Sequence, residues 1–94
     1  MIRVVIERAI AEGLEEPYEQ AIRRTIQQAV QAPGFISGES LRDIDKPNHR
    51  VVFSTWQSVA HWNAWESSES RREQLNELSV MLETDEKVTI LEPA

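Results

Sequence analysis

The chain contains no cysteine, and this absence excludes disulfides, thiolate metal sites, iron–sulfur clusters and cysteine nucleophiles. Positive charge is scarce as well: 10 lysines and arginines against 16 aspartates and glutamates give a net charge of −6. The adjacent pairs Arg23-Arg24 and Arg71-Arg72 lie in predicted helices beside acidic or polar residues, so we expect both pairs on solvated helix faces. An acidic chain without a basic cluster is not expected to bind nucleic acid or an anionic membrane.

Long apolar runs are also missing. No stretch approaches the length of a membrane span. The first eight residues mix charged and apolar side chains, whereas a secretory signal needs a basic segment followed by a long apolar one. A chain of 94 residues has the size of one domain, which we assign to residues 1–94. We therefore expect a single-domain, soluble cytoplasmic protein.

The sequence does contain clear strand and helix patterns. Strands are predicted over residues 2–9, 35–42, 49–56 and 87–91. A first helix is predicted from Pro17 to Val30, where apolar residues recur at helical spacing before Pro33-Gly34 ends the pattern. A second helical region begins after the N-cap Ser58, is interrupted near residues 67–68, and continues with leucines 75, 78 and 82 on one face.

This order of elements is β-α-β-β-α-β, with the second helical region bent into two. It is the ferredoxin-like pattern, an α+β fold in which helices cover one face of an antiparallel four-stranded sheet. The first and third strands are apolar on both sides, as in the run Val51-Val52-Phe53, so the other face of the sheet also needs cover. A second copy packed sheet against sheet is the simplest cover, and we expect a homodimer.

All three tryptophans fall within ten residues: Trp56, Trp62 and Trp65. A tryptophan buries a large apolar body while its indole N–H still needs a partner, so three together predict a rigid aromatic wall. Such a wall is either a corner of the core or one side of a pocket for a flat organic molecule, and Trp62 fits the core better. His61 lies inside the same stretch.

These residues carry a resemblance to a known family. The entry Pro33-Gly34-Phe35, the segment 41–45, the strand that ends in Trp56 and the segment 57–65 resemble the antibiotic biosynthesis monooxygenase (ABM) family. The resemblance implies a dimeric α+β barrel, with a cavity between sheet and helices in each subunit. It also implies an enzyme, because the family includes cofactor-independent oxygenases of quinols and anthrone-like polyketides, and haem-degrading monooxygenases.

Each of these two branches has its own set of catalytic residues, and neither set is complete in this chain. The haem-degrading branch uses a helix tryptophan, matched by Trp65, and a histidine about ten residues later, where this chain has Leu75. The anthrone-oxygenating branch places an asparagine four residues before the strand-end tryptophan, where this chain has Val52, and an arginine further along, near Asn76. Without an axial ligand, haem degradation is not expected, and we expect no cofactor.

Oxygen chemistry without metal or flavin must use the substrate's own electrons, so the protein has to supply a base, a dry pocket and donors for an oxyanion. His61 is the candidate base, because histidine is the side chain that commonly exchanges a proton near neutral pH; the alternative is a first-turn histidine with a backbone or solvent partner. The candidate substrate-binding residues share this neighbourhood: Trp56, Trp65, Asn63, Arg50 and Ser54. The two histidines are twelve residues apart without carboxylates at ligand spacing, so no metal site is expected.

Two functions follow from these observations. The first is a small cofactor-independent monooxygenase that acts with O2 on a quinol or polycyclic phenol. The second is a non-catalytic dimeric α+β barrel that binds a small aromatic ligand as a stress or regulatory module. Both predict an aromatic pocket, and only the first predicts oxygen consumption that depends on His61.

Overall fold

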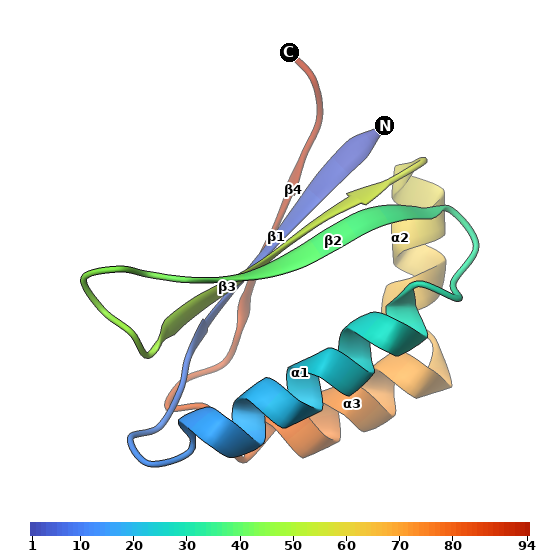
Figure 1. The fold of residues 1–94 in the computed structure, drawn as a ribbon. Helices are drawn as coiled ribbons and strands as arrows, with labels where there is room; N and C mark the ends of the chain where they lie inside the picture. Colours follow the sequence, from blue (N-terminus) through green and yellow to red (C-terminus); the bar gives the residue numbers. More distant parts are fainter.

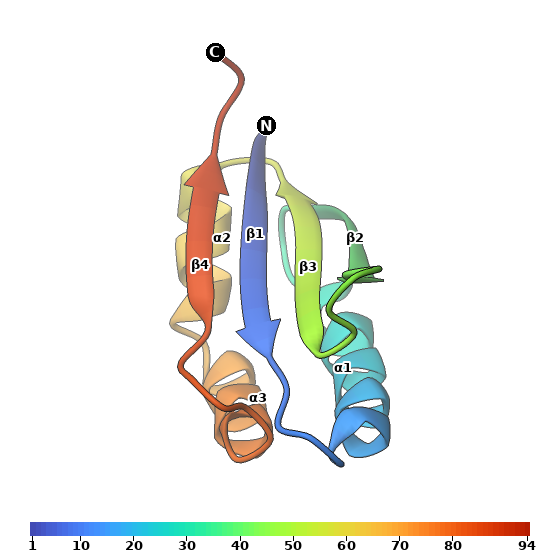
Figure 2. The same ribbon diagram turned by 90° about the vertical axis from the view of Figure 1, so that its left-hand side faces the viewer.

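The computed structural model describes all residues from 1 to 94 and has the predicted order of elements (Figure 1). The elements are β1 (Ile2–Ala9), α1 (Glu15–Ala29), β2 (Phe35–Arg42), β3 (His49–Trp56), α2 (Val59–Glu66), α3 (Glu69–Ser79) and β4 (Lys87–Leu91). The four strands form one antiparallel sheet in the order β2-β3-β1-β4. Figure 2 shows all three helices behind this sheet, on one face. The ferredoxin-like α+β fold is thus confirmed.

Strand alternation decides which side chains enter the core. Along β1, Ile2, Val4 and Ile6 are buried toward the helices, while the residues between them lie on the open face of the sheet. β3 pairs with β1 in register, so that Val52 lies opposite Ile6 and joins the same core. The core between sheet and helices is completed by α1 and by the tryptophans of β3 and α2.

Two serine caps produce the break in the second helical region. Ser58 accepts a hydrogen bond from the backbone N–H of His61 and starts α2, and Ser68 accepts one from Arg71 and starts α3. The prediction that Leu82 continues the leucine face of this helix is wrong. α3 ends at Ser79, and Leu82 instead forms an isolated bridge with Ile10 beside the sheet, because the chain must turn back there to reach β4.

The open face of the sheet is less apolar than predicted. Val5, Val51 and Phe53 lie half-buried in its middle, but Arg3 and Glu7 lie on the same face of β1. The prediction that β1 is apolar on both faces therefore holds only at its centre. No helix in the structure has both the length and the apolar composition needed to cross a membrane.

Candidate functional site

An aromatic cluster forms where β3 meets α2. Trp56, at the end of β3, is 1% exposed and has three aromatic neighbours. The ring centroid of Phe35 is 5.3 Å away and that of Trp62 is 5.6 Å away, both edge-on, while Trp65 stacks at 6.3 Å. The indole N–H of Trp56 donates to Ser54 Oγ over 3.1 Å. The expected aromatic wall is therefore present, and it is fixed by packing and by a buried hydrogen bond.

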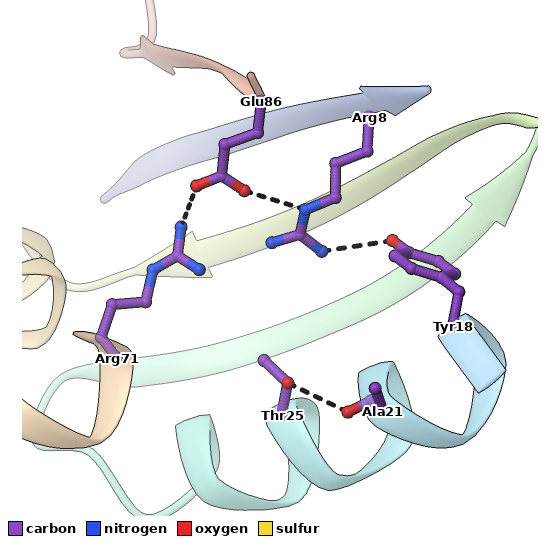
Figure 3. Close-up of polar contacts among 6 residues, drawn as sticks. All are labelled: Arg8, Tyr18, Ala21, Thr25, Arg71 and Glu86. Atoms are coloured by element: carbon purple, nitrogen blue, oxygen red, sulfur yellow. Dashed lines mark hydrogen bonds and ion pairs between the residues drawn. The ribbon is translucent and has the colours of Figure 1, made fainter. Parts of the chain in front are cut away.

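This cluster lines a small internal chamber between the sheet and the helices. The volume of the chamber is about 40 Å³. Its walls are the three tryptophans together with mostly apolar residues of β1, α1 and β3, and two arginines, Arg8 and Arg71, also border it. Thr25 of α1 contributes a hydroxyl, which donates to the carbonyl oxygen of Ala21 (Figure 3). The lining of the chamber thus contains both aromatic and cationic side chains.

The two arginines meet at a single carboxylate. Arg8 Nε donates to Glu86 Oε2 over 2.8 Å, and Arg71 Nη2 donates to Glu86 Oε1 over 2.6 Å, as Figure 3 shows. Arg8 Nη1 also donates to the hydroxyl of Tyr18, 3.2 Å away. Burial lowers the pKa of Arg71, and the charge of Glu86 opposes this shift. Because one carboxylate bridges two guanidiniums, the cluster has one positive charge that no bonded partner balances.

His61 lies outside the chamber, in a groove of about 420 Å³ between the end of α1 and α2. Its Nδ1 is 2.7 Å from Ser58 Oγ, and its ring packs on Gly34. A Cβ at Gly34 would lie 2.2 Å from the ring, and the φ of this residue is +85°, so only glycine fits there. Trp65 borders both the groove and the chamber, and it is the one residue that lines both.

The other predicted site residues divide into two groups. Ser54 lies in the chamber wall beside Trp56. Arg50 is buried but lies apart: its Nε donates to the carbonyl oxygen of Pro47 over 2.6 Å, and its Nη1 to Glu19 over 3.2 Å. Asn63 is exposed on α2 and borders neither the chamber nor the groove. The structure thus brings together Ser54 and the tryptophans, with His61 nearby and Arg50 and Asn63 elsewhere.

The arginine cluster differs from what the sequence predicts. The expectation of a solvated face is right for Arg72, Arg23 and Arg24 but wrong for Arg71, which is 2% exposed. A signal existed, since Arg71 precedes Leu78 by seven residues and so shares its buried helix face. No group of three or more histidine, aspartate or glutamate side chains is placed to hold a metal ion.

The fold and its chamber define a class: a ferredoxin-like α+β protein with an aromatic internal pocket. The sequence pattern of the antibiotic biosynthesis monooxygenase family matches residues 1–74, and the chain belongs to this family. Among curated relatives, protein SchA of Streptomyces halstedii is 27% identical over 77 residues, which are 82% of this chain and 20% of SchA. The chain therefore spans about one fifth of the length of that relative.

Solved structures support the same fold. SnoaB, a cofactor-independent oxygenase from Streptomyces nogalater, superposes with a TM-score of 0.88 at 17% identity, over 98% of this chain and 91% of SnoaB. Rv0793 from Mycobacterium tuberculosis superposes with a TM-score of 0.89 at 15% identity, over 99% of this chain and 94% of that one. At these sequence identities, the two superpositions show that this chain shares the fold of SnoaB and of Rv0793.

Proposed function

We propose that this protein is a homodimeric, cofactor-independent monooxygenase that acts on a small aromatic substrate, such as a quinol or a polycyclic phenol. The observation that carries this proposal is the chamber, whose lining combines stacked Trp56 and Trp65 with a buried cationic cluster, in a chain of the antibiotic biosynthesis monooxygenase family. Stacked indoles suit a flat ring, and a water-poor cationic pocket stabilises an electron-rich anion. The named activity of SnoaB, which shares the fold, points in the same direction.

The reaction needs no reductant besides the substrate. A base removes a proton from the substrate, and the resulting anion transfers electrons to O2. When the substrate is an anthrone, the keto tautomer of a polycyclic phenol, its ring CH2 group is converted to a carbonyl and one water molecule is released. One oxygen atom of O2 enters the product, and the other leaves with the two hydrogens of the CH2. The protein's part is to remove the proton, hold the anion and exclude bulk water.

His61 is the base that we propose, acting from the groove. The chamber is too small for an aromatic ring, so a substrate must displace Trp65, which is half-buried and lines both spaces. That displacement would join the groove and the chamber and place His61 at the edge of one larger pocket. His61 Nε2 forms no hydrogen bond within the chain and is free to accept the proton, with Nδ1 held by Ser58.

An oxygen electrode tests the proposal with a panel of quinols and anthrones. We expect oxygen uptake above the uncatalysed background, and His61→Ala should lower turnover by about 10²–10⁴-fold. Gln57→Ala is the matched control, because this exposed side chain lies one residue before the helix cap. If His61→Ala changes turnover less than tenfold while Trp65→Ala lowers it more, the substrate ionises unaided and His61 is not the base.

A binding module without catalysis is the second candidate. This candidate is favoured because the chain lacks catalytic residues that the resemblance to the family implies. Val52 and Leu75 occupy two of those catalytic positions. A thermal-shift measurement on the same compounds separates the two functions. Compounds that raise the melting temperature without any oxygen uptake would make the chamber a ligand-binding site only.

A further inference from the structure

Two residues that line the chamber have buried N–H groups without a hydrogen-bond acceptor within the chain: Trp62 Nε1 and Arg71 Nε. Their side chains come from α2 and α3 and are 1% and 2% exposed. The third unpaired buried atom, the acceptor Gln74 Oε1, belongs to a residue that does not line the chamber. Buried donors in proteins nearly always have a partner, so two unused donors on residues that line the same chamber indicate that an acceptor belongs there.

Neither hydroxyl of the chamber wall forms a hydrogen bond with these two donors. Ser54 Oγ already accepts from Trp56 and lies 3.4 Å from the carbonyl oxygen of Val4, to which it donates. The hydroxyl of Thr25 donates to a carbonyl of its own helix. A ligand that complements the two unpaired donors therefore brings a hydrogen-bond acceptor.

The charges around the chamber favour a negative ligand. Arg8 and Arg71 share the single carboxylate of Glu86, while Arg50 has its own partner, Glu19. Glu66 also attracts Arg71, but it lies exposed at the surface, where solvent screens it. One guanidinium charge in the wall is thus left for a ligand to balance, and a charged acceptor on a buried guanidinium makes a strong hydrogen bond.

We propose that the larger pocket, which forms when Trp65 moves and the chamber joins the groove, binds its aromatic ligand as a monoanion, with the charged oxygen on Arg71 Nε and Trp62 Nε1 and the ring against Trp56. This inference rests on the proposed function, because it assumes that the substrate occupies the same pocket. It names the substrate class as an aromatic compound with one anionic oxygen group. Arg71 is a binding residue here. Arg8 is a positioning residue, because it acts through Glu86, which fixes the guanidinium of Arg71 (Figure 3).

Calorimetric titration with matched ligand pairs tests the proposal without any turnover. 2-Naphthoate and 2-naphthamide have similar shapes and differ in charge, and we expect the carboxylate to bind at least about tenfold more tightly. In a second arm, 4-nitrophenol is titrated with pH, and its yellow phenolate should appear at lower pH when the protein is present. The two arms tell a carboxylate ligand from a phenolate ligand.

Variants locate the effect. Arg71→Gln should remove the preference for naphthoate, whereas Arg72→Gln, the same change at the exposed neighbouring residue, should leave it intact. Glu86→Gln removes the shared counter-charge but keeps an amide oxygen that can accept from Arg71, so it should strengthen naphthoate binding. If circular dichroism shows that Arg71→Gln does not fold, two other results test the proposal. They are the direction in which Glu86→Gln changes naphthoate binding and the preference of the unmodified protein for naphthoate over naphthamide.

Equal binding of naphthoate and naphthamide, together with an unshifted nitrophenol titration, would overturn the proposal. The two donors would then serve a bound water molecule, for which the chamber has room. Anion binding without oxygen uptake on any compound would support this inference and contradict the monooxygenase function. Oxygen uptake without anion preference would support the function and contradict the inference.

Discussion

Replacement of Trp56 by alanine should destabilise the fold by about 3–5 kcal/mol, the usual cost of emptying a large buried aromatic site. The side chain is 1% exposed and touches the rings of Phe35, Trp62 and Trp65. Those rings come from β2 and α2, so the cavity would open where sheet and helix meet. The change also removes the indole hydrogen bond to Ser54, which leaves a buried hydroxyl without its donor.

The consequence is large because a domain of this size has little stability to lose. A chain of 94 residues is stabilised by roughly 5–14 kcal/mol, so the variant loses a substantial fraction of the total. The melting temperature should fall by about 12 °C or more. Urea unfolding followed by circular dichroism, at one fixed protein concentration, measures the free energy directly.

Trp56→Phe is the matched control, because it keeps an aromatic ring in the cluster and removes only the indole N–H and part of the volume. It should cost about 1–2 kcal/mol. A loss of only a few tenths of a kcal/mol for Trp56→Ala, with ligand binding abolished, would refute the reasoning. Trp56 would then be a pocket wall that contributes little to the core.

Three further predictions concern the assembly, the cofactor and the pH response. Light scattering at micromolar concentration should give the mass of two chains, because the apolar centre of the open sheet face needs cover; the mass of one chain would contradict the dimer. The purified protein should carry no haem, since Leu75 stands where the haem-degrading branch has its ligand; a Soret band that survives dialysis and saturates at one haem per chain would contradict this. His49 Nδ1 lies 2.9 Å from Asp43 Oδ2, and this hydrogen bond, with a further contribution from Glu7, raises the pKa of His49. Its stabilising effect is therefore present at acid pH and is lost as pH rises through the raised pKa. In a proton NMR titration Asp43→Asn should lower the pKa of His49, and an unchanged value would contradict the pairing.

The sequence predicted the fold well because its signals are local. The alternation in β1, the serine caps Ser58 and Ser68 and the glycine turn at Gly34 each depend on neighbouring residues, and each appears in the structure. The aromatic cluster was also predictable, since Trp56 ends a buried strand and Trp65 lies in the helix that follows it.

The polar part of the site depends on contacts that no local pattern reveals. Arg8 and Glu86 are 78 residues apart, and only the pairing of β1 with the chain end around β4 brings them together. Helical spacing could have placed Arg71 on a buried face, but its partner is not visible in the sequence. His61 was expected among the tryptophans, yet its hydrogen bond to Ser58 and the close approach of Gly34 hold it on the groove side of Trp65.

Oxygen-isotope labelling tests the central claim most directly. The protein, purified without metal or flavin and kept in chelator, is given 18O2 and the anthrone or quinol that the electrode screen identifies. The account predicts that each product molecule gains one 18O atom, at a rate well above the uncatalysed reaction. Turnover at the background rate, or a product without the label, would contradict it.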